Sequence, residues 1–182
     1  MNQKDAFLNR KQHKNNSKDD FRTPEYLWDF INNTFHIEYD AACEKGINNL
    51  APSLRLEDDW PSNSTIYSNP PYDKESIIKY VHKGWRHTFN HGTHIMLLPN
   101  KLCQVFMSDL IVEFDHIIYL HGRVNFEGPN SVKGGASMNG SIIVIQSHLD
   151  YSNFPNSYKL SDLKRWYSWK LNAENVKLFL QL

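Results

Sequence analysis

Hydrophobic residues recur along this chain with two different spacings, which predict helices and strands respectively. An apolar residue at every third or fourth position predicts amphipathic helices over residues 22–35, 73–85 and 102–113. Helices and strands then alternate, which predicts an α/β fold with a doubly wound, mainly parallel sheet covered on both faces. The strands are predicted from short apolar runs at residues 36–43, 64–68, 93–99, 116–122 and 141–146.

Side chains at the predicted boundaries support several of these elements. Thr23 can cap the first helix and Pro24 suits its first position, while Asp73 stands where the second helix begins. In that second helix Trp85 falls on the apolar face. The last two strands are joined by a glycine-rich loop without a helix, so we expect an antiparallel final strand.

Three parts of different composition follow one another along the chain. Residues 1–20 are polar and basic, and we expect a tail that only a partner would order. Residues 21–150 carry the alternating pattern and form one predicted domain. Residues 151–182 are expected to be a helical extension. Within the domain, residues 44–63 mix turn signals with brief apolar pieces and are expected to be irregular, with one short strand near Leu50.

Composition limits the class of protein without indicating an activity. The 182 residues include 40% hydrophobic residues, enough for one core. The formal net charge is zero, but residues 1–22 and 159–182 each carry +3 (6 − 3 and 5 − 2), which leaves −6 for the centre. Contacts with an anionic partner and ordinary solvated surfaces both explain basic ends.

Cysteine usage and hydropathy indicate the setting. Cys43 and Cys103 have no Cys or His partners at metal-ligand spacing, which argues against a zinc site and against a disulfide scaffold. The amino-terminal stretch is polar, and no run of about 18 apolar residues occurs. We therefore expect a cytoplasmic protein without a membrane span.

The stretch Asn69-Pro70-Pro71-Tyr72 follows a predicted strand at the edge of the sheet where α/β proteins bind ligands. Its prolines stiffen the backbone and leave carbonyl groups outside the helix. An amine on a heteroaromatic base is a poor nucleophile until acceptors take its protons. The Asn69 amide oxygen and the Pro70 carbonyl can do so while Tyr72 stacks on the ring, which suits methyl transfer from S-adenosylmethionine. A rigid turn with a packed tyrosine is the simpler alternative.

Longer motifs carry a resemblance to a known family. The runs DDFRTPEYLWDFI, YDAAC, LEDDW, YSNPPYDKESIIKYVHKG, HIMLLP and LHGRVNF occur in the order and approximate spacing of the phage-type DNA adenine-N6 methyltransferases (Dam). The chain resembles this family over residues 20–146. The resemblance implies the class I methyltransferase fold, S-adenosylmethionine as cofactor, and methylation of the N6 amine of a flipped adenine in double-stranded DNA. It also associates the chain with phage genes and with restriction–modification. A phage-encoded enzyme would act in the host cytoplasm, and the sequence leaves open whether a restriction enzyme accompanies it.

The resemblance also assigns roles to individual residues. It implies a catalytic loop at residues 69–72. The implied cofactor site consists of Thr23, Pro24, Asp40, Ala41 and Asp59. Two of these assignments have alternatives: Asp40 could simply cap the turn after its strand, and Asp58 could take the place of Asp59. The glycine-rich loop that the wider methyltransferase superfamily has after the first strand is missing from this sequence.

Contacts with DNA are expected after the strand 116–122. Phe126 can stack on the extruded adenine, Arg123 can meet a phosphate, and Lys133 in the glycine-rich loop can follow the DNA, although a core phenylalanine and solvent-exposed loop residues are equally plain interpretations. Trp166 and Trp169 lie among basic residues and can form a stacking surface, but core packing is the favoured interpretation.

Two alternative functions stay open. The same loop serves methyltransferases that act on RNA bases or on glutamine side-chain amides. A catalytically inactive module that binds DNA or protein is the third possibility. The sequence leaves the oligomeric state open between monomer and homodimer.

Overall fold

The structure is a computed structural model that describes residues 22–42, 51–127, 133–136 and 139–180. Its centre is a six-stranded sheet in the order β1-β2-β3-β7-β4-β8. These strands are β1 (Tyr39–Asp40), β2 (Thr65–Ser68), β3 (Thr93–Pro99), β7 (Ser141–Ser147), β4 (His116–His121) and β8 (Ser157–Lys159). A separate two-stranded sheet pairs β5 (Asn125–Glu127) with β6 (Lys133–Ala136).

The strand directions confirm a mixed, mostly parallel sheet. β1, β2 and β3 pair in parallel, and β8 pairs in parallel with β4. β7 is antiparallel to both of its neighbours, β3 and β4. The predicted antiparallel pairing of the last two apolar runs is therefore confirmed. The antiparallel strand lies inside the sheet, and the short β8, which the apolar pattern does not predict, follows it in the chain.

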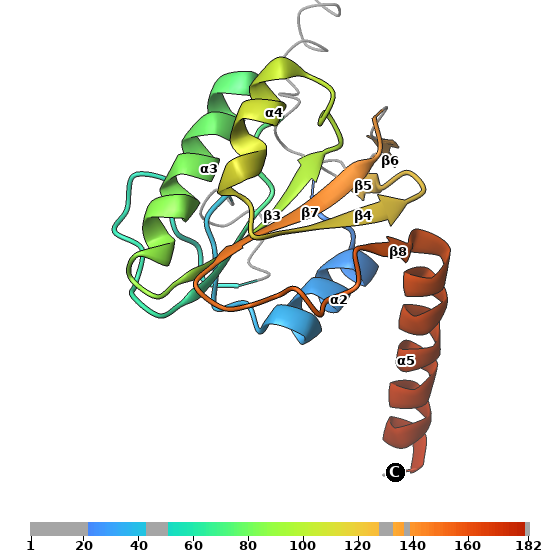
Figure 1. Cartoon of the computed structure of the whole chain (residues 1–182). Coiled ribbons are helices and arrows are strands. Elements are labelled where there is room, and N and C mark those ends of the chain that lie inside the picture. Colours follow the sequence, from blue (N-terminus) through green and yellow to red (C-terminus); the bar gives the residue numbers. More distant parts are fainter. Residues whose placement is uncertain (1–21, 43–50, 128–132, 137–138, 181–182) are drawn as a thin grey trace, which may run out of the picture.

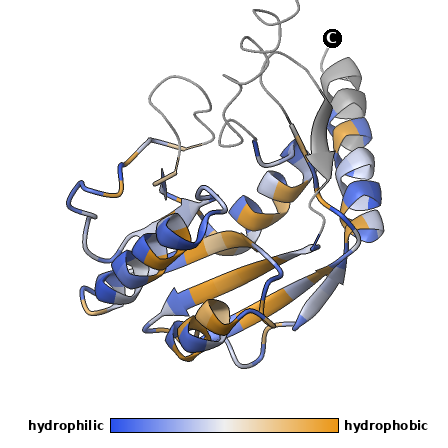
Figure 2. Cartoon of the chain, turned by 90° about the horizontal axis from the view of Figure 1, so that it is seen from above, coloured by the Kyte–Doolittle hydropathy of each residue, from blue (hydrophilic) through white to orange (hydrophobic). Residues whose placement is uncertain are grey.

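Helices cover both faces of the sheet (Figure 1). They are α2 (Glu25–Phe35), α3 (Lys74–Thr88), α4 (Val105–Leu110) with the 3-10 turn η1 (Ile111–Glu113), and α5 (Leu160–Leu180). One core lies between the sheet and α2 with the first turn of α5, and the other lies between the sheet and α3 with α4. Successive residues of β3 enter opposite cores, with Ile95 and Leu97 in the first and Met96 and Leu98 in the second. Figure 2 shows these hydrophobic strands between the helices.

Several elements differ from the sequence prediction in extent. The predicted strand 36–43 keeps only Tyr39–Asp40, because His36 takes a left-handed conformation (φ 55°) and the Asp40 carboxylate accepts a bond from Ala42 N. The predicted helix 102–113 contains only six α-helical residues before η1. The predicted tail 1–20 and the strand near Leu50 lie outside the described residues.

The segment after residue 150 contributes to the sheet as well as forming a helix. β8 adds the edge strand beside β4, and Leu160 and Leu163 of α5 are buried in the first core. Among the described residues, no helix is both long and apolar enough to cross a membrane.

Candidate active site

The Asn69–Tyr72 loop joins the carboxyl end of β2 to the amino end of α3. Ser68 is the last residue of β2, and Asp73 caps α3 through its Oδ1, which accepts from Ser76 N at 2.9 Å. Pro70 is buried, while Asn69 and Tyr72 are half-buried. The loop therefore lies at the sheet edge where the strand prediction put it, with side chains that a ligand can still reach.

Tyr72 is held on three sides. Its hydroxyl donates to Asn69 Oδ1 at 2.9 Å, its carbonyl accepts from Lys101 Nζ at 3.1 Å, and its ring meets the edge of Phe126 with the centroids 5.9 Å apart. Burial raises the pKa of Tyr72 far above its ordinary value, so the hydroxyl keeps its proton and stays a donor. This bond fixes the side on which the Asn69 amide presents its oxygen.

Lys101 is a residue of this site that sequence reasoning missed. It lies two residues beyond the carboxyl end of β3, the strand that pairs in parallel with β2. Carboxyl ends of neighbouring parallel strands meet at one edge of a sheet, so its position after a buried strand was the available signal. Its ammonium group brings a positive charge into contact with the backbone of the loop 69–72.

A buried network of hydrogen bonds connects Ser68, the residue before the loop, to His94 and Gln146. His94 Nε2 lies 2.8 Å from Ser68 Oγ, and His94 Nδ1 lies 3.3 Å from Gln146 Oε1. The Gln146 amide nitrogen donates to the carbonyls of Val81 and Glu113, so Gln146 Oε1 is an acceptor and His94 must carry its proton on Nδ1. Ser68 then donates to His94 Nε2. Burial lowers the pKa of His94 to about 3, which keeps the ring neutral.

Tyr67 gathers the predicted cofactor residues around the end of β2. Its hydroxyl lies 2.6 Å from Thr23 Oγ1, and its Cα register partner across the parallel pair is Asp40. Its carbonyl accepts from Ala41 N at 2.8 Å. Pro24 is buried and its carbonyl accepts from Leu27 N and Trp28 N at the start of α2. Thr23, Pro24, Asp40 and Ala41 thus come together beside the catalytic loop.

Asp40 is a buried carboxylate, 6% exposed. Burial raises its pKa to about 6, although the bond that it accepts from Ala42 N lowers it. Asp40 is therefore compatible with both interpretations of its role. It caps the turn that follows β1, and it also provides a desolvated carboxylate at the sheet edge, as a cofactor site would require.

Asp58 and Asp59 differ in what their side chains do. Asp58 Oδ2 accepts from Arg55 N at 2.8 Å and so closes a turn. Asp59 is exposed, and no hydrogen bond or ion pair links its carboxylate to another described residue. Asp59 is accordingly the freer of the two to meet a ligand.

The predicted DNA-contacting residues lie in different environments. Arg123 is exposed, whereas Phe126 is 6% exposed and packs against Tyr72. The backbone of Lys133 lies in β6. Trp166 and Trp169 are exposed on α5, so the favoured expectation of core packing was wrong. No group of three or more His, Cys, Asp or Glu residues in the described chain could hold a metal ion.

The mixed α/β sheet, with the loop 69–72 at the carboxyl end of β2, is consistent with the fold of a methyltransferase. Comparison with known families is specific: residues 10–165 match the family described as DNA N-6-adenine-methyltransferase (Dam), and the chain belongs to that family. It is an adenine-specific DNA methyltransferase, and its methyl donor is S-adenosylmethionine. No curated protein matches the chain.

Proposed function

We propose that the chain methylates N6 of an adenine rotated out of duplex DNA, and that residues 69–72 hold the reacting amine. The observation that carries this proposal is the bond from Tyr72 to Asn69 Oδ1, which keeps an amide oxygen oriented at the carboxyl edge of the sheet. Adenine N6 inside a duplex is stacked and paired, so the base must leave the helix to meet this edge.

Each residue of the loop has a separate task. Asn69 Oδ1 and the Pro70 carbonyl accept the two N–H bonds of the amine, which localises the nitrogen lone pair. Pro70 and Pro71 keep the backbone carbonyls fixed, and the Tyr72 ring stacks on the base. S-adenosylmethionine, when bound, supplies an electrophilic methyl group. The acceleration then comes from positioning and from acceptors that need no reorganisation.

The residues around Tyr67 fit such a methyl donor. Asp40 is a desolvated carboxylate and suits the donor's ammonium group, because a cation returns the stabilisation that burial removes from the ionised form. Thr23, Pro24 and Ala41 surround the same end of β2. Asp59, exposed and without a described partner, suits the adenine end of the donor.

The DNA-facing assignments extend the proposal. Arg123 is exposed and suits a phosphate. Phe126 acts through Tyr72 in this conformation and would contact the extruded base only if its ring moved. Lys133 would follow the backbone of the DNA. The basic tail 1–20 would add phosphate contacts, and the whole enzyme would serve a phage in its host cytoplasm, with or without a companion restriction enzyme.

A substrate comparison tests the proposal. The full chain is incubated with a methyl-labelled donor and, in separate reactions, duplex DNA, single-stranded DNA, RNA and a protein mixture. We expect label in duplex DNA above all other substrates. Label confined to RNA or protein would contradict the proposal, and so would donor binding without transfer to any of the four.

A further inference from the structure

The carboxyl-terminal helix exposes two tryptophans. Trp166 is 40% exposed and Trp169 is 67% exposed, whereas only Leu160 and Leu163 of the described α5 side chains enter the core. Tryptophan is rarely left in water, and it is enriched where proteins bind partners. Trp169 lies beyond the residues that match the family, so family membership does not account for it.

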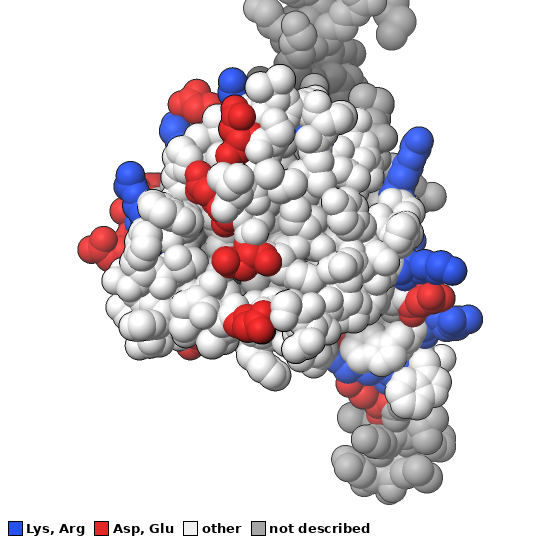
Figure 3. All heavy atoms as spheres, in the orientation of Figure 1, with Lys and Arg blue, Asp and Glu red and all other residues white. Residues whose placement is uncertain are grey.

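Basic side chains flank these tryptophans. Three exposed basic residues meet one acid, a net charge of 3 − 1 = +2. They are Arg123, Lys159 and Arg165, with Asp162 as the acid. Figure 3 shows Lys and Arg with a few acidic side chains along the right-hand edge of the molecule, over β8 and α5, and a row of acidic side chains with Lys and Arg at its left over the face with α3 and α4. Arg165 pairs with Asp162 at 3.0 Å, but both side chains are largely exposed, so a stronger anion can replace that contact.

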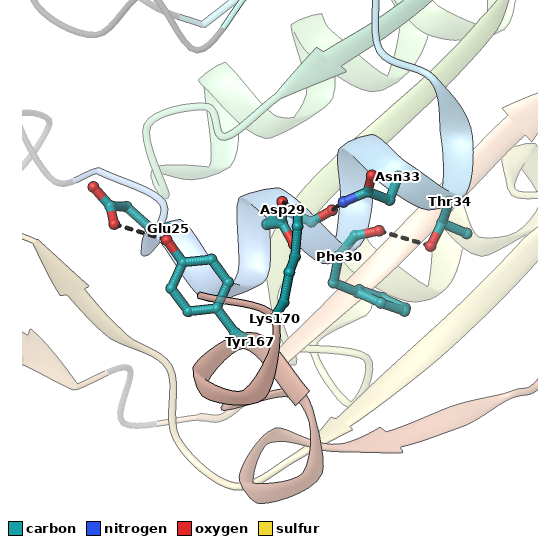
Figure 4. Close-up of polar contacts among 7 residues, drawn as sticks. All are labelled: Glu25, Asp29, Phe30, Asn33, Thr34, Tyr167 and Lys170. Atoms are coloured by element: carbon teal, nitrogen blue, oxygen red, sulfur yellow. Dashed lines mark hydrogen bonds and ion pairs between the residues drawn. The ribbon is translucent and has the colours of Figure 1, made fainter. Parts of the chain in front are cut away.

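The opposite face of α5 is anchored to α2. Tyr167 donates to Glu25 at 3.0 Å and Lys170 donates to Asp29, and Figure 4 shows both side chains directed toward α2. Lys164 lies over the Tyr26 ring, 5.1 Å from its centroid. These contacts fix the rotation of α5 about its axis. Arg165 and Trp169, four residues apart, therefore present one common face away from α2.

The segment that carries Arg123 connects the start of α5 to the loop 69–72. Phe126 contacts Tyr72, and Arg123 lies three residues before Phe126. A Cβ built on Gly122 would lie 3.4 Å from Leu160, so the Arg123 segment packs against the start of α5. His121 and Lys159 are register partners in the β4–β8 pair. A series of contacts thus connects the loop 69–72, through the segment that carries Arg123, to the start of α5.

We propose that Arg123, Lys159, Arg165 and Trp169 form a binding surface, here called the α5 rim, for duplex DNA that flanks the flipped adenine. Duplex DNA carries a negative charge about every 1.7 Å, which complements the rim, whereas a second copy of this basic surface would repel it. Trp169 lies nine residues beyond Leu160, about 14 Å along the helix, or roughly four base pairs of duplex. The aromatic ring offers an apolar surface to deoxyribose while Arg165 offers donors to phosphate. The inference rests on the proposed function.

A salt titration of duplex affinity tests the α5 rim. Labelled duplexes with the adenine at the centre are titrated with the full chain and with Lys159→Gln/Arg165→Gln. We expect the slope of log K against log salt to become shallower by about 1.8, since each lost phosphate contact removes about 0.9. Lys79→Gln/Arg86→Gln on α3 removes the same charge from exposed positions away from the rim and should leave the slope unchanged.

Trp169→Ala separates the aromatic contact from the charges. We expect the variant to bind the full-length duplex about fivefold more weakly than the wild-type chain does, with an unchanged salt slope. On a duplex shortened at the flank that reaches α5, the variant and the wild-type chain should bind with equal affinity. Equal slopes for the rim and control variants would overturn the inference. So would a Trp169→Ala change in sedimentation from dimer to monomer with DNA affinity intact. Methyl transfer by the wild-type chain to the same duplexes separates a failure of the rim from a failure of the proposed function.

Discussion

The hydroxyl of Tyr72 and the amide of Asn69 form the smallest unit on which the chemistry depends. A primary amide presents an acceptor and a donor, and only the acceptor can draw a proton from an adenine amine. The hydroxyl of Tyr72 donates to Asn69 Oδ1, so this oxygen is identified as the acceptor end of the amide. Tyr72 orients Asn69 through this bond, and in the proposed function its ring also serves as an aromatic platform for the base.

Tyr72→Phe separates these two tasks. The phenylalanine keeps the aromatic ring and loses the bond to Asn69, which is worth roughly 0.5–1.5 kcal/mol, so we expect kcat to fall by about two- to tenfold with little change in the KM for the methyl donor. Tyr72→Ala should cost more, because the ring is lost as well. Single-turnover rates measure both. Equal rates for Tyr72→Phe and Tyr72→Ala would show that the ring has no part in the reaction.

The buried carboxylate of Asp40 lowers the stability of the protein when it is ionised. Its pKa is about 6 in the folded chain against an ordinary 3.8, so the folded state binds more protons than the unfolded state between these values. Stability attributable to this group is therefore highest below about pH 4 and falls as the pH rises through about 6. Above that pH the buried charge is a cost that a bound cation can offset.

Asp40→Asn should raise stability and weaken donor binding together. At about pH 8 we expect the free energy of unfolding to rise by up to about 3 kcal/mol, and at about pH 4 we expect no gain, because the carboxyl is then protonated in the fold. Calorimetry should show weaker S-adenosylmethionine binding by the variant at about pH 8. In the wild-type chain the affinity should fall as the pH is lowered below 6. A variant that is less stable at pH 8 would contradict the cost assigned to the buried charge. A variant that binds the donor normally would show that Asp40 is not part of the cofactor site.

At the scale of elements, α3 packs closely on the sheet through a glycine. A Cβ on Gly84 would lie 2.0 Å from His94 Nδ1 and 2.2 Å from Gln146 Oε1. Those atoms belong to the buried chain that ends at Ser68, the residue before Asn69. The position of α3 and the position of the catalytic loop are therefore set by the same contact.

Gly84→Ala should destabilise the fold although alanine favours helices. Helix propensity alone predicts a gain of about 1 kcal/mol, whereas overpacking against His94 and Gln146 should give a net loss of about 1–3 kcal/mol. Urea unfolding measures the difference, with Arg86→Ala at an exposed α3 position as the matched control. A more stable Gly84→Ala variant would mean that α3 can move away from the sheet without cost.

The elements that the sequence predicts well are those with long apolar patterns. The helices near residues 22–35 and 73–85 and the strands β3, β4 and β7 follow from periodicity, because each buries a continuous face. β8 has three residues of which only Tyr158 packs on a core, so it leaves almost no pattern. The sequence predicts Trp85 on the apolar face of its helix, but Trp85 is 45% exposed and packs on Phe89. The buried residues in this part of α3 are Gly84 and His87.

At the scale of the whole molecule, parallel strands bring distant residues to one edge. Sequence reasoning predicted the loop 69–72 and grouped it with Thr23, Pro24 and Asp40 through the family resemblance, and the structure brings these residues together around Tyr67. Lys101 was missed although its position after a buried strand was a signal. Tyr67 and the His94–Gln146 chain could not be predicted, because each acts through contacts between elements far apart in sequence. The exposure of Trp169 was also unpredictable, since a helix with interspersed aromatic residues has the same sequence pattern whether these residues are buried in the core or exposed for a partner.

The most direct test of the central claim is the nucleoside content of duplex DNA after incubation with S-adenosylmethionine and the purified chain. Mass spectrometry should find N6-methyladenine with the wild-type chain and with Asn90→Ala, an exposed control. With Asn69→Ala the initial rate should fall about 100-fold or more, while the variant stays folded and still binds the methyl donor. N6-methyladenine formed by Asn69→Ala at the wild-type rate would contradict the claim that this amide oxygen activates the amine.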